Sequence, residues 1–199
     1  GIKMAAMILL IVATYKLTDI VMGPMANPFY IDMGYTLEEI GYVVKITALF
    51  FTIAGIFFGG ILIKRKGIFY SLIFGAFLVM LTNLFFSYAA INEKNIITLS
   101  LIVASDSLAA GIVGTVNITF LTSLVSPKYT GFQYALLTSL MAFLGKAFGG
   151  FSGLIVENFQ LLFGFNFGWM FFYFFTSILS LPAIFLIFKN RNFFKTLTK

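Results

Sequence analysis

The sequence predicts an all-α membrane protein, a bundle of six transmembrane helices. Apolar residues make up 60% of the 199 residues and charged residues only 10%, a balance typical of polytopic membrane proteins. Apolar runs long enough to cross a ~30 Å hydrocarbon core recur along the chain, and in lipid such a run is a helix because it must pair its own backbone groups. We predict a single transmembrane domain, residues 1–199, with spans at about 4–26, 38–63, 68–90, 96–125, 131–157 and 167–188.

Turn-forming and charged residues separate these spans. Boundaries are predicted at the stretches 64–67 (Lys-Arg-Lys-Gly), 92–95 (Asn-Glu-Lys-Asn) and 126–128 (Ser-Pro-Lys). The first span carries Gly23-Pro24 and Asn27-Pro28 near its end. Glycine and proline loosen or end a helix, so a broken helix is expected there.

Basic residues mark one side of the membrane. The N-terminus, the 64–67 and 126–130 loops and the C-terminal tail hold nine of them: Lys3, Lys64, Arg65, Lys66, Lys128, Lys189, Arg191, Lys195 and Lys199. The loops on the other side hold only Lys94. Short loops rich in lysine and arginine stay in the cytoplasm, so both termini are predicted to be cytoplasmic. Topology thus accounts for most of the net charge of +6, and no nucleic-acid partner is expected.

The residue types present exclude several kinds of chemistry. The chain has no Cys and no His, which removes thiolate nucleophiles, disulfides and imidazole metal ligands. We expect no metal, no cofactor and no enzymatic activity, and any proton carrier must be one of seven carboxylates. Asp19 and Asp106 could mimic an intramembrane aspartyl protease, but their flanking residues lack that class's motifs. A voltage-gated channel is disfavoured because both arginines lie at loops.

Five charged residues lie away from the ends of the predicted spans: Lys16, Asp19, Lys45, Asp106 and Lys146. Lys16 and Asp19 share a helix face and lie ~18–23 Å from Met4 along the helix, near mid-membrane. A charge there costs at least ~2.5 kcal/mol, so it normally faces protein or a water-filled cavity. These charges are therefore candidates for substrate binding or proton coupling.

The order of the charges indicates an internal repeat. The first and fourth spans carry an acid, the second and fifth a lysine, and the third and sixth carry neither. Two three-helix repeats with lipid-facing third members would give this order, and inverted repeats of this kind occur in secondary transporters. Asn117 lies eleven residues after Asp106 and shares its helix face. Gly55 and Gly59 are spaced for close helix packing.

Several stretches resemble the AmpG-type muropeptide permeases of the major facilitator superfamily. The resemblance is carried by Tyr15–Asp19, Pro28-Phe29, the stretch from Gly34 to Lys45, Gly59-Gly60 before 64–67, Gln133–Leu137, Gly149 and Gly153 with Glu157, and Gly168-Trp169 with Phe172-Tyr173. It covers nearly the whole chain and matches the C-terminal half of such a permease. Gly60 with Lys64, Arg65, Lys66 and Gly67 resembles the superfamily's cytoplasmic loop motif. This stretch lacks the motif's usual Asp, to which a gating salt bridge is assigned.

The resemblance implies proton-coupled import of anhydromuropeptides for cell-wall recycling across the bacterial inner membrane. It places Lys16, Asp19, Asp106 and Asn117 at a central cavity and Lys45 and Lys146 near the seam between two halves. Asp19 or Asp106 is the expected proton carrier. Lys16 and Lys146 are expected to contact anionic groups of the substrate, with Gln133 and Asn117 as hydrogen-bonding partners for sugars; Lys45 is a further possible site residue.

Three alternatives stay open. Lys16 could serve only to neutralise Asp19. The chain could also be a permease of the same superfamily for another solute, or a truncated or split half that is inactive alone. Six spans form half of the usual cavity, so transport would need an N-terminal six-helix half or a second copy.

Overall fold

The computed structural model describes residues 2–125 and 130–197. Every regular element within these ranges is helical, which agrees with the all-α prediction. Lys128 and Lys199, two of the basic residues that support the predicted topology, lie outside the described residues. Four helical stretches of the described chain are long and apolar enough to cross a membrane: Met7–Asp32, Leu37–Ala90, Ile96–Leu124 and Phe165–Lys189.

The helices follow one another with short connections. The first stretch consists of α1 (Ile2–Met22), a 3-10 turn (Gly23–Met25) and α2 (Ala26–Asp32). The second consists of α3 (Leu37–Tyr42), a π-helical turn (Val43–Thr47) and α4 (Ala48–Ala90). The remaining helices are α5 (Ile96–Leu124), α6 (Thr130–Gly149), α7 (Ser152–Phe163), α8 (Phe165–Ile178), α9 (Leu181–Lys189) and α10 (Arg191–Leu197).

The first stretch is interrupted where the glycine and prolines predict it, but it does not end there. Gly23 and Pro24 form the 3-10 turn, and α2 then continues to Asp32, beyond the predicted end at about residue 26. Pro28 lies in the first turn of α2, where a helix needs no backbone N–H donor. Proline is therefore tolerated at this position, and the broken helix extends by another turn or two.

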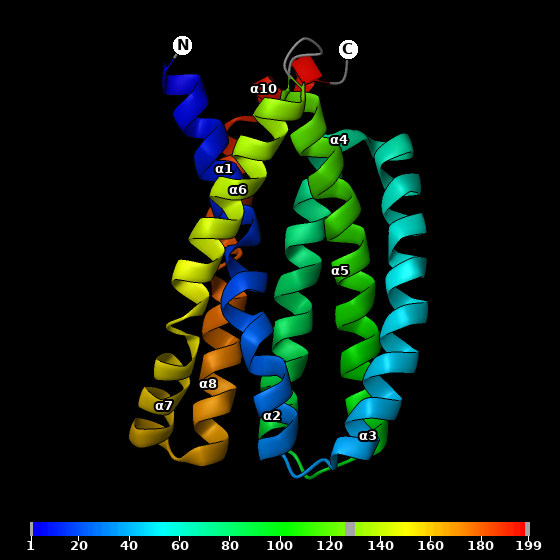
Figure 1. Ribbon diagram of the computed structural model, residues 1–199, viewed down its shortest axis with the longest axis vertical. Coiled ribbons are helices and arrows are strands. Elements are labelled where there is room, and N and C mark those ends of the chain that lie inside the picture. The colour runs from blue at the N-terminus through cyan, green and yellow to red at the C-terminus, as the bar shows by residue number, and fades with distance from the viewer. Residues whose placement is uncertain (1, 126–129, 198–199) are drawn as a thin grey trace.

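Helix α4 contains a reversal of the chain at Gly67. The backbone of Gly67 is non-helical, with φ 77° and ψ 171°, a region that glycine enters without steric cost. Figure 1 shows the run before Gly67 rising to one end of the bundle and the run after it returning beside α5. We call these two runs α4a (48–66) and α4b (68–90). The predicted spans 38–63 and 68–90 fall on either side of the reversal.

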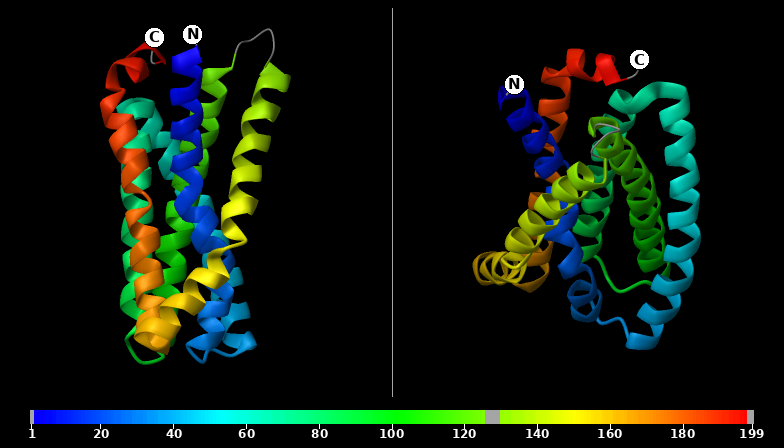
Figure 2. Two further views of the ribbon diagram at one scale, coloured as in Figure 1. Left: turned by 90° about the vertical axis from the view of Figure 1, so that its left-hand side faces the viewer. Right: turned by 45° about the horizontal axis from the view of Figure 1, so that its top comes forward.

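The bundle has two recognisable ends. The beginning of α1, the α4 reversal and α10 lie at one end, and the α2–α3 and α4–α5 connections lie at the other (Figures 1 and 2). The basic residues at 64–66 therefore share an end with Arg191, as the topology prediction requires. One buried hydrophobic cluster lies toward each end, around Leu72 and Val116 in the first and around Phe86 and Trp169 in the second.

Glycines bring α4a and α5 into backbone contact. A Cβ atom at Gly55 would collide with the carbonyl oxygen of Leu108, and one at Gly111 would collide with that of Thr52. A Cβ at Gly59 would lie 3.1 Å from the Ile112 carbonyl oxygen. The close packing expected for Gly55 and Gly59 is therefore present, because no larger residue would fit between these helices.

Candidate functional site

Lys16 and Asp19, the charged residues of the first predicted span, form an ion pair in the structure. Lys16 Nζ donates a 2.7 Å hydrogen bond to Asp19 Oδ2, one turn further along α1. Both side chains are partly exposed, 22% for Lys16 and 31% for Asp19. Lys16 and Asp19 therefore neutralise each other's charge, and both side chains remain partly accessible beside α1.

Asp106 on α5 completes a three-charge cluster with this pair. Its carboxylate interacts electrostatically with Asp19, which repels it, and with Lys16, which attracts it. The side chain is half-buried, and the described residues place no cation within ion-pair distance of it. The cluster thus holds two carboxylates and one ammonium, so one carboxylate is paired and the other is not.

Tyrosines from three elements surround the cluster. Tyr15 on α1 is buried within range of the Asp19 charge, while Tyr30 on α2 and Tyr173 on α8 lie within range of Asp106. The Tyr15 hydroxyl has no hydrogen-bond partner among the described residues, whereas the Tyr173 hydroxyl donates to the Met25 carbonyl at the 3-10 turn. Sequence reasoning did not assign these tyrosines a site role, because aromatic residues are common throughout the chain.

An aromatic cluster fixes the broken end of the first stretch. The Phe29 ring packs edge-on against Trp169 and Tyr173, with centroid distances of 5.4 and 5.0 Å. Trp169 Nε1 donates a 3.0 Å hydrogen bond to Asp32 Oδ2 at the end of α2. Trp169 is 1% exposed. α8 thereby holds α2 in place although the helix is interrupted just before it.

A second set of polar contacts joins the two connections at the same end. The Tyr35 hydroxyl donates to the Asn95 carbonyl and accepts from the Asn95 backbone N–H, at 2.9 and 3.2 Å. Lys94 Nζ lies 2.7 Å from Glu39 Oε2 and 5.4 Å from the Tyr35 ring centroid. Thr36 and Glu39 form a reciprocal capping box at the start of α3. These contacts fix the α2–α3 connection to the α4–α5 connection.

Four other predicted site residues lie on α5, on α6 and in the π-helical turn. Asn117 is only 4% exposed and lies in the packed interior further along α5. Lys146 on α6 is exposed, one turn before Gly149, which packs against the Ile20 carbonyl. Lys45 is exposed in the π-helical turn, and Gln133 is half-buried near the start of α6. The structure therefore brings Lys16, Asp19 and Asp106 within electrostatic range of one another.

The predicted loop motif lies at the α4 reversal. Lys64, Arg65 and Lys66 are exposed in the last turn before Gly67. Gly60 lies one turn earlier, and a Cβ placed there would meet nothing within 4 Å. Of the two motif glycines, Gly67 is the one whose backbone conformation favours glycine.

Comparisons with known proteins give a consistent result. The chain is 33% identical over 186 residues to the putative transporter AmpG 1 of Rickettsia prowazekii and 33% identical over 185 residues to the putative transporter AmpG 4 of Rickettsia conorii. It is 29% identical over 194 residues to the anhydromuropeptide permease of Escherichia coli. The chain is a homologue of the AmpG transporters. No family model matches it.

The AmpG relatives are longer than this chain. The matches cover 94%, 93% and 96% of the chain but only 40%, 43% and 38% of the respective relatives. The chain therefore spans about two fifths of the length of the AmpG proteins it matches, a share consistent with a C-terminal half. Together with the apolar helices, the permease relatives identify it as a membrane protein.

Proposed function

We propose that this chain is the C-terminal half of a proton-coupled importer of anhydromuropeptides, with the major facilitator fold and a location in the bacterial inner membrane. The observation that carries the proposal is the cluster of Lys16, Asp19 and Asp106 on apolar helices of an AmpG homologue. Charges on membrane helices mark solute and proton pathways, because a charge without such a role is costly in lipid. The Escherichia coli relative is an anhydromuropeptide permease, and this name supplies the substrate class.

Under this proposal the two carboxylates have different roles. Lys16 already neutralises Asp19, so that pair can remain intact in the membrane. Asp106 has no ion-pair partner among the described residues, and it is the carboxylate that takes up and releases the proton. Protonation of Asp106 also removes its repulsion from Asp19. The net charge of the cluster then changes from −1 to zero, so the cluster no longer repels a carboxylate of the peptide part of the substrate.

Further contacts to the substrate come from α6 in this proposal. Lys146 is exposed on a helix that packs along α1, so its ammonium can reach an anionic group beside Lys16. Gln133 is half-buried on the same helix and offers hydrogen bonds to a sugar. The first, second, fourth and fifth predicted spans then face the cavity or the partner half, and two inverted three-helix repeats account for the arrangement.

The exposed apolar side chains of α4a support a partner in this proposal. Helices α3 and α4a belong to the apolar stretch Leu37–Ala90. Only 11% of the residues in the most apolar 18-residue segment of this stretch are buried. Exposed apolar side chains such as Leu49, Phe50 and Phe57 occupy this run. We propose that an N-terminal six-helix half, or a second copy of the chain, covers these side chains and completes the cavity.

Uptake of a labelled anhydromuropeptide tests the proposal. Bacterial cells that lack their own muropeptide permease are to produce this chain alone, an AmpG N-terminal half alone, or both together. Accumulation only when both are present supports a half transporter. Accumulation with the chain alone would point to a second copy as partner. No accumulation in any combination, with both proteins in the membrane, would contradict the proposed function, and uptake of another solute would contradict the proposed substrate.

A further inference from the structure

A groove lies between α4a, α4b and α5, away from the charged cluster. Its cavity volume is about 430 Å³, within the ~300–1,000 Å³ range of small-molecule sites. Nine residues line it: the apolar Phe58, Ile61, Leu62, Phe74, Leu78, Leu108 and Ile112, and the basic Arg65 and Lys66. None of the lining residues belongs to α1, which carries Lys16 and Asp19.

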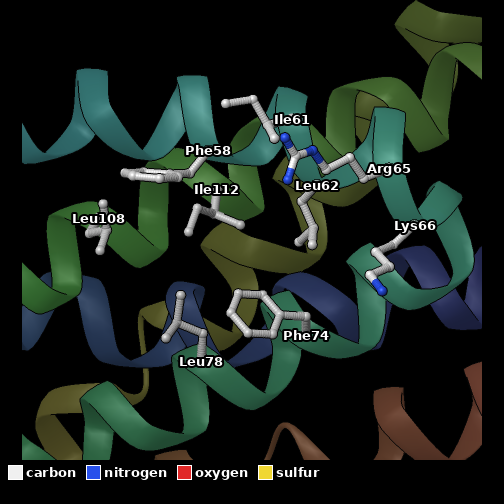
Figure 3. A pocket seen from close by; sticks show the side chains of 9 residues that line it. All are labelled: Phe58, Ile61, Leu62, Arg65, Lys66, Phe74, Leu78, Leu108 and Ile112. Carbon is white, nitrogen blue, oxygen red and sulfur yellow. The ribbon is translucent and has the colours of Figure 1, made fainter.

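The two basic residues lie together at one end of the groove. Figure 3 shows Arg65 and Lys66 at one end and Phe58 and Leu108 toward the other. Phe58 and Arg65 are seven residues apart on α4a, which separates them by ~10 Å along the helix axis. The groove is therefore cationic at the end near Gly67 and purely apolar over the remainder of its length.

The walls of the groove are open to the outside of the bundle. Phe58 is 59% exposed, Ile61 48% and Phe74 44%. Phe74 lies on α4b, the third predicted span, which faces lipid in the proposed repeat, and the reversal at Gly67 then places the basic end of the groove near the headgroups. Basic pockets between membrane helices on the cytoplasmic side bind anionic headgroups, and the guanidinium fork matches phosphate geometry.

We propose that this groove binds an anionic phospholipid, with an acyl chain along the apolar walls and the phosphate on Arg65 and Lys66. Charge and shape together select this occupant. A free phosphate would leave the apolar walls without a partner. A zwitterionic lipid brings its own cation, which opposes the two basic side chains. The inference is independent of the transported substrate, because it rests only on the membrane location, the proposed repeat and the groove.

Fluorescence quenching by brominated lipids tests this site. The chain has one tryptophan, Trp169, which is buried on α8 and supplies a constant background. Phe58→Trp places a reporter in the groove at an exposed position where the larger ring is tolerated, and Ile61→Trp is a second reporter. The full chain is reconstituted in phosphatidylcholine vesicles, and brominated phosphatidylglycerol is compared with brominated phosphatidylcholine.

The expected result is preferential quenching by phosphatidylglycerol. Each basic residue should contribute roughly a fivefold preference, so the combined Arg65→Gln and Lys66→Gln variant should quench equally with both lipids. Lys189→Gln, which neutralises an exposed basic residue outside the groove, should keep the preference. Equal quenching of the unmodified groove, or preference lost only through competition by millimolar inorganic phosphate, would overturn the proposal. Absence of quenching by either lipid from both reporters would also overturn it, because a protein segment would then fill the groove.

Discussion

Lys16 and Asp19 form a 2.7 Å ion pair within one turn of α1, and Asp106 on α5 lies within electrostatic range of both. One ammonium cannot pair fully with two carboxylates. Asp19 therefore has an ion-pair partner, whereas Asp106 has none among the described residues, and this difference is why we propose Asp106 as the proton carrier. The two carboxylates should therefore respond differently to substitution.

Removal of Lys16 should destabilise the protein. Lys16→Met leaves two carboxylates that repel each other, and an unpaired charge at the centre of a membrane helix costs at least ~2.5 kcal/mol. The partial exposure of both side chains reduces this effect. We expect a lower thermal unfolding temperature in detergent, with recovery in the Lys16→Met/Asp19→Leu double variant. Lys146→Met is the control, because Lys146 is exposed; an equal loss in that variant would contradict the prediction.

Two buried tyrosine hydroxyls should respond oppositely to removal. The Tyr15 hydroxyl has no hydrogen-bond partner among the described residues, so Tyr15→Phe should leave the free energy of unfolding unchanged or raise it by ~1 kcal/mol. The Tyr35 hydroxyl makes two hydrogen bonds to Asn95, so Tyr35→Phe should lower it by ~1–2 kcal/mol. Denaturation of both variants under identical conditions measures the difference. A loss in Tyr15→Phe as large as that in Tyr35→Phe would show that the hydroxyl has a protein partner.

The Trp169–Asp32 hydrogen bond should control how tightly α8 holds α2. Asp32→Ala removes the acceptor, and a hydrogen bond to a charged group contributes ~1.5–3 kcal/mol. We expect a red-shifted emission and stronger acrylamide quenching of Trp169, the only tryptophan in the chain. Asp32→Asn keeps an acceptor oxygen and should retain most of the shielding. Identical quenching in Asp32→Ala and the unmodified protein would mean that the aromatic packing alone fixes α2.

The glycine contact between α4a and α5 should not tolerate a methyl group. A Cβ at Gly111 would collide with the backbone of α4a, and forced overpacking typically costs ~1–3 kcal/mol. Gly111→Ala should therefore lower the unfolding temperature. Gly60→Ala is the matched control, because a Cβ there meets nothing within 4 Å and alanine favours a helix by ~1 kcal/mol. Equal unfolding temperatures for the two variants would contradict the observed backbone contact.

The sequence predicts those features that depend on local pattern. Apolar runs and their bounding charges indicate an all-helical membrane protein, and the Lys16–Asp19 spacing predicts a shared helix face. The glycines at positions 55 and 59 predict close packing, which the structure shows. Sequence spacing also marks the break at Gly23-Pro24, although the continuation to Asp32 depends on packing against Trp169.

Contacts between distant segments could not be predicted from the sequence. The Glu39–Lys94 and Tyr35–Asn95 contacts join segments more than fifty residues apart, and no periodicity links them. Asn117 is predicted to share a face with Asp106, but its burial, 4% exposed against a half-buried Asp106, depends on the neighbouring helices and not on its spacing. The placement of Tyr30 and Tyr173 near Asp106 likewise could not be predicted, because α2 and α8 are far apart in the sequence and come together only in the folded chain.

The most direct test of the central claim separates proton coupling from substrate movement in the Asp106→Asn variant. The chain and an AmpG N-terminal half are to be reconstituted together, and labelled anhydromuropeptide is measured as uphill accumulation under an imposed proton gradient and as exchange without a gradient. We predict that Asp106→Asn loses accumulation and keeps exchange, because the asparagine retains the shape of the side chain without a titratable proton. Unchanged accumulation in this variant would contradict the assignment of Asp106 as the proton carrier, and loss of both activities with the protein folded would assign it to substrate binding instead.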